Sequence, residues 1–328
     1  MKVLVTTFPF AEKDKTPLQI LKKENIDFTL NPFNRKIKES ELYKLINNFD
    51  AIIAGTEKFS KSTLLKAEKL KLISRVGIGL DGIDLNFAKK KTIQISYTPD
   101  APSNAVAELT LANILTLIRN IHVANLGSHK KKWLRYFGYD LNDTIIGIIG
   151  AGRIGSLVVK KLFSLGVNRI FINDIKRDNL LKNKFREKII WTSKLNILKK
   201  CNVISIHIPL YDKTKNFIDK NSFNIMRNDC ALINTSRGGV VCEKDLFFAL
   251  NNNKISSAAI DVFEKEPYYG PLSMLNNCLL TSHMGSMTFK SRALMEIEAT
   301  REVVRFIKKK PLKVEVPDYE YKRARKIL

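Results

Sequence analysis

Three short segments of the sequence place reactive side chains directly after apolar runs. They are INTSRGG at 233–239 with Arg237, IDVFEKEP at 260–267 with Asp261, Glu264 and Glu266, and LLTSHMGS at 279–286 with His283. His283 is one of only four histidines, and a single histidine indicates no chemistry by itself. If the apolar runs are parallel strands, however, their carboxyl ends meet at one edge of a sheet, where ligands bind. An arginine there could bind a 2-keto acid through paired hydrogen bonds, and a histidine supported by a carboxylate could transfer the proton that accompanies a hydride.

The segment IIGIIGAGRIGS is the strongest motif for a bound ligand. Gly150, Gly152 and Gly155 directly follow an apolar strand and open the predicted helix RIGSLVVKKLFSL. Glycines at this spacing permit a tight turn and let the backbone approach a pyrophosphate at the helix N-terminus. Asp174 lies near the end of the next predicted strand, where a carboxylate accepts hydrogen bonds from ribose hydroxyls and repels a 2′-phosphate. The motif predicts a bound dinucleotide and favours NAD over NADP, although a lysine and an arginine closely follow Asp174.

Strands and helices alternate along the chain, and the strands are nearly continuous apolar runs. Such runs are typical of parallel sheets that are covered by helices on both faces. A first α/β series ends near residue 97, a proline-rich break follows at 98–103, and a second series begins at 144–150. We therefore predict an α/β protein with two doubly wound parallel-sheet domains.

Two long helical patterns lie outside these series. One covers 104–127 and is apolar on more than one face, so we expect it to be deeply buried or to contact another subunit. The other, over 291–310, is amphipathic and closes the pattern. The charged tail from residue 311 is expected to be peripheral.

The composition predicts a globular protein, and we expect a cytoplasmic location. A chain of 328 residues is long enough for two domains, and no apolar stretch approaches the ~20 residues that a membrane helix needs. The start, MKVLVTTFPF, predicts a first strand rather than a signal peptide. The cysteines contain no CxxC pair, so we expect neither a metal site nor a disulfide framework. They are Cys201, Cys230, Cys242 and Cys278.

The net charge of +24 comes from 56 basic and 32 acidic residues. A chain this basic could bind nucleic acid. Its lysines are spread over the whole length, however, and lysine dominates over the arginine and interleaved aromatics on which nucleic-acid sites usually depend. We therefore expect surface lysine and no functional nucleic-acid partner.

Seven segments together give a highly specific resemblance that covers nearly the whole chain. They are RVGIGLDGID (75–84), TPDAPSNAVAEL (98–109), GIIGAGRIG (147–155), VISIHIPL (203–210), INTSRGGVV (233–241), AAIDVFEKEP (258–267) and LLTSHMGS (279–286). In these the chain resembles the D-isomer-specific 2-hydroxyacid dehydrogenase family. The resemblance implies a flavodoxin-like substrate domain, formed by 1–100 and 288–328, into which an NAD-binding Rossmann domain (101–287) is inserted. It also implies a homodimer joined through the cofactor domain.

The resemblance assigns roles to individual residues. It implies that Arg237, Glu266 and His283 are catalytic, and that backbone amides at Ile78 and Gly79 hold the substrate carboxylate together with Arg237. The residues implied in NAD binding are Gly150, Gly152, Arg153, Ile154, Gly155, Asp174, His207, Pro209, Thr235, Asp261 and Gly285.

Three departures from the family pattern bear on the substrate. Ser282 stands where the family usually has proline, and Cys242 stands where it usually has aspartate. Ala54 occupies the position of an arginine that helps many 3-phosphoglycerate dehydrogenases to hold the phosphate, although Lys58 is close by. We expect an enzyme that interconverts a D-2-hydroxy acid and its 2-keto acid, with 3-phosphoglycerate and 3-phosphohydroxypyruvate as the first candidates, in a short form without a regulatory domain. The alternatives are a glyoxylate/hydroxypyruvate or D-lactate-type reductase and, in another class, an NAD(H)-sensing protein like the co-repressors of this fold.

Overall fold

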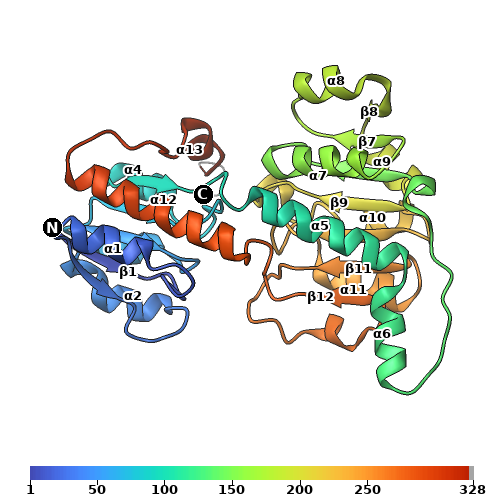
Figure 1. Cartoon of the computed structure of the whole chain (residues 1–328), viewed down its shortest axis with the longest axis horizontal. Helices are drawn as coiled ribbons and strands as arrows, with labels where there is room; N and C mark the ends of the chain where they lie inside the picture. Colours follow the sequence, from blue (N-terminus) through green and yellow to red (C-terminus); the bar gives the residue numbers. More distant parts are fainter. Residues whose placement is uncertain (325–328) are drawn as a thin grey trace. The chain divides into compact units, whose positions relative to one another are not determined.

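The chain folds into two compact units, each described by itself (Figure 1). The structure is a computed structural model that describes residues 1–324. The first unit comprises residues 1–102 together with the chain from residue 287 onward, and the second comprises residues 103–286. The second unit is therefore an insertion in the first.

The sheet of the first unit has five parallel strands in the order β2-β1-β3-β4-β5. Its strands are β1 (Lys2–Val5), β2 (Asp27–Leu30), β3 (Ala51–Ala54), β4 (Leu72–Arg75) and β5 (Gln94–Tyr97). The central strand β3 is buried along its whole length, as its unbroken apolar sequence AIIA predicts. The strand order changes direction between β1 and β3, which is the flavodoxin-like arrangement predicted from the sequence.

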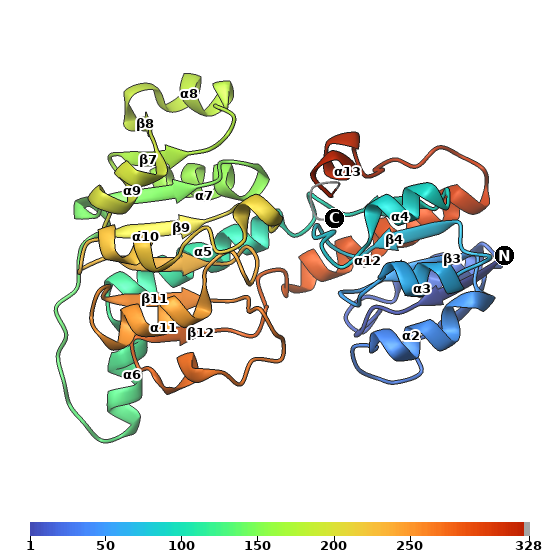
Figure 2. The ribbon, with the colours of Figure 1, turned by 180° about the vertical axis from the view of Figure 1, so that it is seen from behind.

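Helices cover both faces of this sheet (Figures 1 and 2). They are α1 (Thr16–Lys23), α2 (Glu39–Leu45), α3 (Lys61–Lys66), α4 (Leu85–Lys90), α12 (Phe289–Ile307) and α13 (Asp318–Ala324). On one face α12 buries Met295, Ala299 and Val303 against the strands, next to α1. On the other face α2 and α3 bury Leu42 and Leu64. The first unit is thus completed only by a helix from the far end of the chain.

The segment after α12 belongs to this core, so the prediction of a peripheral tail is wrong. Val316 and Tyr321 are buried among the residues of the α2–α4 face. The N–H of Val316 donates to the carbonyl of Ile95 at 2.9 Å, and the Lys89 ammonium lies 4.8 Å from the centre of the Tyr321 ring. Two apolar side chains attach this lysine-rich segment to the sheet.

The sheet of the second unit has seven parallel strands in the order β12-β11-β10-β9-β6-β7-β8. Its strands are β6 (Ile146–Ile149), β7 (Ile170–Asn173), β8 (Ile189–Trp191), β9 (Val203–Ile206), β10 (Ala231–Asn234), β11 (Ser257–Ile260) and β12 (Cys278–Leu280). Six of them follow the Rossmann order, with β12 added at the edge. The predicted fold class is confirmed.

Helices cover both faces of this sheet as well. They are α5 (Ser103–Ile118), α7 (Arg153–Ser164), α8 (Asn179–Phe185), α9 (Lys194–Lys200), α10 (Lys220–Ile225) and α11 (Glu243–Asn251). Helices α5, α7 and α8 pack on one face, and α9, α10 and α11 pack on the other. The apolar helix α5 has 16 residues, and within residues 1–324 no helix has the length and apolar character needed to cross a membrane.

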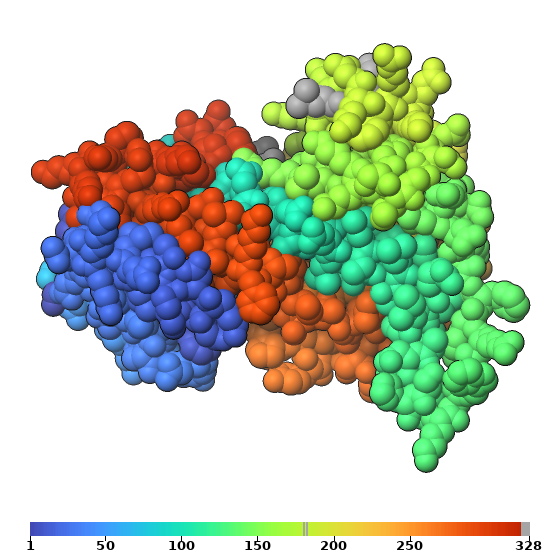
Figure 3. All heavy atoms as spheres, viewed as in Figure 1, coloured from blue at the N-terminus to red at the C-terminus, as the bar shows by residue number. Residues whose placement is uncertain are grey.

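The single helix predicted over 104–127 is wrong, because the structure divides it at Asn120. Helix α5 ends at Ile118, and α6 (Ile121–His129) begins after Asn120, whose φ of 55° is left-handed. Asparagine tolerates this conformation better than most residues, and its side-chain amide donates to the carbonyl of Phe137 at 2.9 Å. Residues 121–139, which we call the arm, stand away from the layers of their unit (Figures 1 and 3).

Candidate active site

Most of the predicted site residues follow strand ends at one edge of the seven-stranded sheet. Gly150 and Gly152 follow β6, Asp174 follows β7, His207 and Pro209 follow β9, Thr235 and Arg237 follow β10, Asp261 follows β11, and His283 and Gly285 follow β12. Because all seven strands are parallel, these ends share one edge, which is where such sheets bind ligands.

Asp261 holds the loop that carries His283. Its side chain is 1% exposed. Oδ1 accepts the hydroxyl of Thr281 at 2.6 Å and the N–H of Met284 at 2.8 Å, and Oδ2 accepts the N–H of Gly285 at 3.0 Å. The N–H of His283 donates to the Asp261 carbonyl at 2.8 Å, and His283 has a left-handed φ of 51°. Because an ionised carboxylate only accepts, Asp261 satisfies all three donors at once. Its contribution to cofactor binding stays a prediction.

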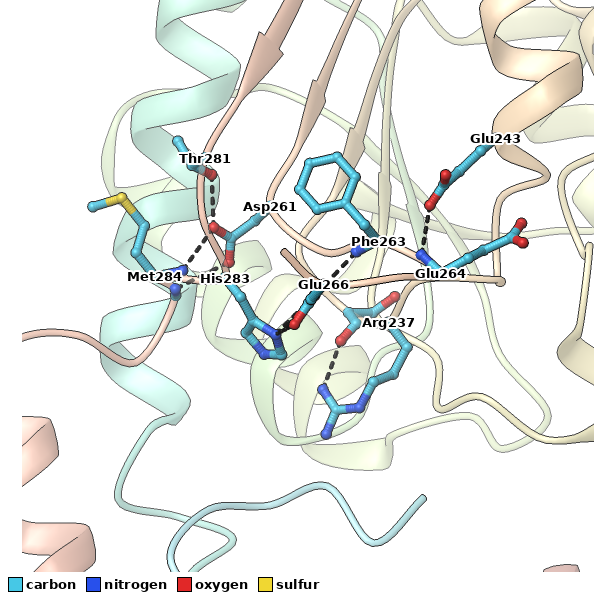
Figure 4. Close-up of polar contacts among 11 residues, drawn as sticks. Arg237, Glu243, Asp261, Phe263, Glu264, Glu266, Thr281, His283 and Met284 are labelled. Carbon is cyan, nitrogen blue, oxygen red and sulfur yellow. Dashed lines mark hydrogen bonds and ion pairs between the residues drawn. The ribbon is translucent and has the colours of Figure 1, made fainter. Parts of the chain in front are cut away.

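His283 and Glu266 form the central pair of the site (Figure 4). Nδ1 of His283 lies 2.8 Å from Oε2 of Glu266 and 3.0 Å from Oε1. The side chains are 38% and 30% exposed, so the ring is accessible from solvent. The Glu266 carboxylate is itself oriented by the N–H of Phe263, which donates to Oε1 at 3.1 Å. Among the residues that the structure describes, Nε2 of His283 has no partner and can meet a substrate.

Arg237 comes from a turn that packs against the loop of Glu266. Oδ1 of Asn234 accepts the N–H and the hydroxyl of Ser236 at 3.0 and 2.7 Å, and its amide donates to the Arg237 carbonyl at 3.0 Å. A Cβ added to Gly238 would lie 2.0 Å from the carbonyl of Phe263, so the two loops meet backbone to backbone. Figure 4 shows the guanidinium and the imidazole on the same side of these loops.

The glycine turn fits a dinucleotide. Gly150 has a φ of +95°, and a Cβ added to Gly155 would lie 1.9 Å from the Gly150 carbonyl oxygen, so helix α7 packs directly on the turn. A Cβ added to Gly152 would meet nothing within 4 Å, which leaves open space where α7 begins. The exposed Arg153 and the half-buried Ile154 form the first turn of α7, whose N–H groups suit a pyrophosphate.

Asp174 lies against this turn. Its Oδ2 accepts the N–H of Ala151 at 2.6 Å and its Oδ1 accepts the N–H of Lys176 at 2.9 Å. The carboxylate is therefore fixed beside the glycines, in the place that suits the ribose hydroxyls of a dinucleotide. Lys176 itself is exposed.

Three other residues predicted to bind the cofactor differ in their burial and in their hydrogen-bond partners. His207 is half-buried, its Nε2 lies 2.9 Å from the Ser205 hydroxyl, and burial lowers its pKa to about 3, so the imidazole is neutral at physiological pH. The hydroxyl of Thr235 pairs with that of Thr110 on α5 at 3.0 Å. Pro209 is exposed. The roles of all three in cofactor binding stay predictions.

Ile78 and Gly79 lie in the first unit, directly after β4. The preceding N–H, of Gly77, donates to the Thr98 hydroxyl at 2.7 Å, whereas those of Ile78 and Gly79 donate to no residue within 1–324. The buried Arg75 donates to two carbonyls of the same loop, including that of Gly79 at 3.1 Å. Two adjacent N–H groups beside a guanidinium are suited to bind a carboxylate.

The roles of two residues that position the site were not predicted from the sequence. Oε1 of Glu243 accepts the N–H of Glu264 at 2.5 Å and so holds the loop of Glu266 (Figure 4). Burial raises the pKa of Glu243, and the neighbouring Glu264 and Glu266 act in the same direction. The helix dipole alone already favours an acidic residue at the start of α11, so the sequence pattern does not indicate this contact. The other missed residue is Asn234, whose only sequence signal is its place at a strand end.

The second unit matches a known family. Residues 111–285 match the family model described as D-isomer specific 2-hydroxyacid dehydrogenase, NAD binding domain. This range contains all seven strands of the sheet and every residue predicted to bind the cofactor.

Proteins similar to this chain in sequence or structure are named after different substrates. The D-3-phosphoglycerate dehydrogenase of Methanocaldococcus jannaschii is 36% identical over 77% of this chain and 48% of that protein, so the chain spans about half the length of that relative. The glyoxylate reductase of Thermococcus litoralis is 32% identical over 81% of this chain and 83% of that protein. The crystal structure of D-lactate dehydrogenase from Aquifex aeolicus complexed with NAD and lactic acid superposes with a TM-score of 0.84 at 26% identity, covering 94% of this chain and 96% of that one.

Proposed function

The chain belongs to the D-isomer specific 2-hydroxyacid dehydrogenase family, and we propose that it interconverts a D-2-hydroxy acid and its 2-keto acid with NAD as the cofactor. The observation that carries this proposal is the 2.8 Å pairing of His283 with Glu266 beside the turn of Arg237. NAD, when bound, exchanges a hydride with C2 of the substrate.

His283 transfers the proton in this proposal. Glu266 holds Nδ1, so Nε2 is the nitrogen that meets the substrate. During oxidation, the neutral Nε2 takes the proton of the substrate hydroxyl. During reduction, the imidazolium returns that proton to the carbonyl oxygen. The Glu266 carboxylate orients the ring and stabilises the imidazolium through their ion pair.

Arg237 and the loop after β4 bind the substrate in this proposal. The guanidinium donates through Nη1 to the Ser236 carbonyl at 2.7 Å, and its fork of N–H groups can turn to bind the carbonyl oxygen and the carboxylate of the substrate. The adjacent N–H groups of Ile78 and Gly79 support a second contact to the carboxylate, because neither donates to another described residue.

A panel of four keto acids tests the proposed reaction. We expect NADH oxidation with at least one of 3-phosphohydroxypyruvate, hydroxypyruvate, glyoxylate and pyruvate, measured by the loss of NADH absorbance. No turnover with any of them, together with tight NADH binding by calorimetry, would contradict the proposal and favour an NAD(H)-sensing protein.

Substitution of His283 tests the mechanism. His283→Asn should lower kcat by roughly 10²–10⁴-fold, the usual contribution of a general acid–base, with NADH affinity near that of the wild type. Glu266→Gln should lower kcat less, because the amide oxygen can still accept from Nδ1. Glu264→Gln is the matched control, since the hydrogen bond of Glu264 in this loop is made by its backbone N–H and not by its side chain. Near-wild-type turnover in His283→Asn would refute the assignment.

We also propose that the arm joins two copies of the chain. Its exposed large apolar residues are Ile121, Leu126, Trp133, Leu134, Tyr136, Phe137 and Tyr139. Monomeric proteins rarely expose so many together. Sedimentation velocity should show a dimer that Trp133→Ser with Phe137→Ser converts to a monomer, whereas the control Phe248→Ser, outside the arm, stays dimeric. A monomeric wild type at micromolar concentration would contradict this proposal.

A further inference from the structure

The five-stranded sheet of the first unit has its own ligand-binding position. In the strand order β2-β1-β3-β4-β5, the connections leave β1 and β3 in opposite directions. Doubly wound sheets bind ligands in the crevice that this reversal opens beyond the carboxyl ends of the two strands. The side chain found there is that of Glu57, three residues after β3, and it is only 3% exposed.

The Glu57 side chain folds back over the end of its own strand. Oε1 accepts the hydroxyl of Thr6, which follows β1, and the N–H of Gly55 at 3.0 Å. A Cβ added to Gly55 would lie 2.8 Å from Oε2 of Glu57 and 3.0 Å from Cα of Thr7. Gly55 therefore makes the room in which the carboxylate bridges the ends of β1 and β3.

The second oxygen of this carboxylate accepts no hydrogen bond from the described part of the chain. Among residues 1–324, the hydrogen bonds of Glu57 end at Oε1, and Oε2 is left without one. Because every fully buried side-chain oxygen of the described residues has a hydrogen-bond partner, Oε2 is not fully buried, and a ligand that replaces its water can donate to it.

The cationic side chains near Glu57 act on other groups. Lys58 is exposed, and its charge acts on Glu39, whose pKa it helps to lower. Arg292 pairs with Glu296 at 2.6 Å and donates to the Thr7 hydroxyl at 2.9 Å. Ala54 supplies no charge at the end of β3, and the guanidinium of its register partner Arg75 donates to the carbonyls of Val76 and Gly79. The crevice therefore offers a negatively charged hydrogen-bond acceptor. Each of these cationic side chains already has another partner.

The loop proposed to bind the substrate carboxylate runs beside Glu57. The N–H of Val76 donates to the Ala54 carbonyl at 2.9 Å, and the N–H of Phe59 donates to the Gly82 carbonyl at 2.7 Å. These bonds align residues 55–59 with residues 76–82, which include the free N–H groups of Ile78 and Gly79. A small acid held at one end by these amides can present its other end to Glu57.

We propose that Oε2 of Glu57 accepts a hydrogen bond from a hydroxyl on the substrate tail, so the chain selects hydroxylated 2-keto acids, of which hydroxypyruvate is the simplest, and rejects phosphorylated ones. This inference rests on the proposed function. A site built to hydrogen-bond a hydroxyl discriminates against an analogue that lacks it, because the bound analogue displaces water from the acceptor and offers no donor in its place. A phosphate in the same place would put two like charges together in a poorly hydrated crevice.

The test compares substrates that differ only in the tail. We expect the wild-type kcat/KM for hydroxypyruvate to exceed that for pyruvate and that for 3-phosphohydroxypyruvate by roughly 10²-fold or more each. Glu57→Gln keeps an oxygen for Thr6 and Gly55 but puts an uncharged NH₂ group at the place of Oε2. It should shrink the ratio to 3-phosphohydroxypyruvate at least tenfold, and the ratio to pyruvate less, because the hydroxyl of hydroxypyruvate can still accept from that NH₂ group. Glu39→Gln is the matched control, because Glu39 also accepts a threonine hydroxyl in this unit, from Thr63 at 3.1 Å. Its ratios should be those of the wild type.

The outcomes separate this inference from the proposed function. A wild type that prefers 3-phosphohydroxypyruvate, or ratios that Glu57→Gln leaves unchanged, would overturn the inference while keeping the dehydrogenase activity. Absence of turnover with all of these acids and with glyoxylate, which has no tail, would overturn the proposed function itself. If Glu57→Gln does not fold, the wild-type ratios decide.

Discussion

Replacing Asp261 by asparagine should damage the loop of His283 without changing any group that touches the substrate. The asparagine can keep its oxygen at the position of Oδ1, where the Thr281 hydroxyl and the Met284 N–H donate at 2.6 and 2.8 Å. Its NH₂ group then faces the N–H of Gly285, which donates to Oδ2 at 3.0 Å in the native chain. Two donors would meet in a place that is closed to water.

The cost follows from the lost hydrogen bond and its charge. A hydrogen bond to an ionised group contributes about 1.5–3 kcal/mol, and a buried donor without a partner adds to that loss. We therefore expect Asp261→Asn to lower the free energy of unfolding of the second unit by about 2–4 kcal/mol. The loop can relieve the clash only by moving, and a misplacement of about 1 Å at a catalytic group can cost on the order of 10²-fold in rate.

Urea denaturation followed by circular dichroism gives the stability, and kcat is measured with the best keto acid of the panel. The matched control is Asp219→Asn, since Oδ1 of Asp219 accepts the N–H and hydroxyl of Ser222 at the start of α10. Asparagine caps helices about as well as aspartate, so both quantities should change little. If Asp261→Asn lost less than about 0.5 kcal/mol and kept its kcat, the loop would not depend on this carboxylate.

Three further predictions concern the cofactor, a helix end and the response to acid. The wild type should prefer NAD(H) over NADP(H) by at least about tenfold in kcat/KM, which is about 1.4 kcal/mol. Asp174→Ser should reduce this preference. Equal use of both cofactors by the wild type would contradict the prediction. Cys242 is the N-cap of α11 and its side chain makes no capping hydrogen bond, while Asp245 and Glu264 lie near its thiol, so the uncharged replacement Cys242→Ser should raise the free energy of unfolding by about 1 kcal/mol in urea, and Cys242→Ala should not. The folded-state pKa of His207 is about 3, below its ordinary value, so protonation of the unfolded chain below about pH 6.5 favours unfolding. Stability should therefore fall as the pH drops from about 6.5 toward 3, by up to about 2 kcal/mol at pH 5, and His207→Gln should remove that part of the loss.

Much of the second unit could be predicted because its signals are local. Gly150 and Gly155 stand where the backbone conformation and close contacts of the turn exclude side chains, and the spacing of the glycines in the sequence is enough to predict this turn. The positions of Arg237, Asp261 and His283 after apolar runs were enough to place them at one edge, because parallel strands share their carboxyl ends.

Features that depend on distant partners could not be predicted. The break at Asn120 interrupts an apolar pattern that continues on both sides, and its left-handed conformation is stabilised by a contact with Phe137. Glu57 stands in a polar stretch that predicts an exposed loop, and only its contact with Thr6 at the end of β1 shows that it is buried. Burial of Tyr321 likewise depends on a sheet formed more than two hundred residues earlier in the chain.

The insertion of the second unit also determines an order of events on the ribosome. The face of the first sheet that α12 covers, which includes Val3, Val5 and Ile53, is complete in the nascent chain long before Met295, Ala299 and Val303 are synthesised. At the usual rates of translation, residues 103–286 take roughly 10–40 s to appear. During that time the second unit, whose strands are consecutive in the sequence, can fold by itself, while the first presents an apolar surface that a chaperone can bind. A destabilising substitution in α12 should therefore reduce the yield of folded protein in the cell more than it reduces the equilibrium stability of the finished chain.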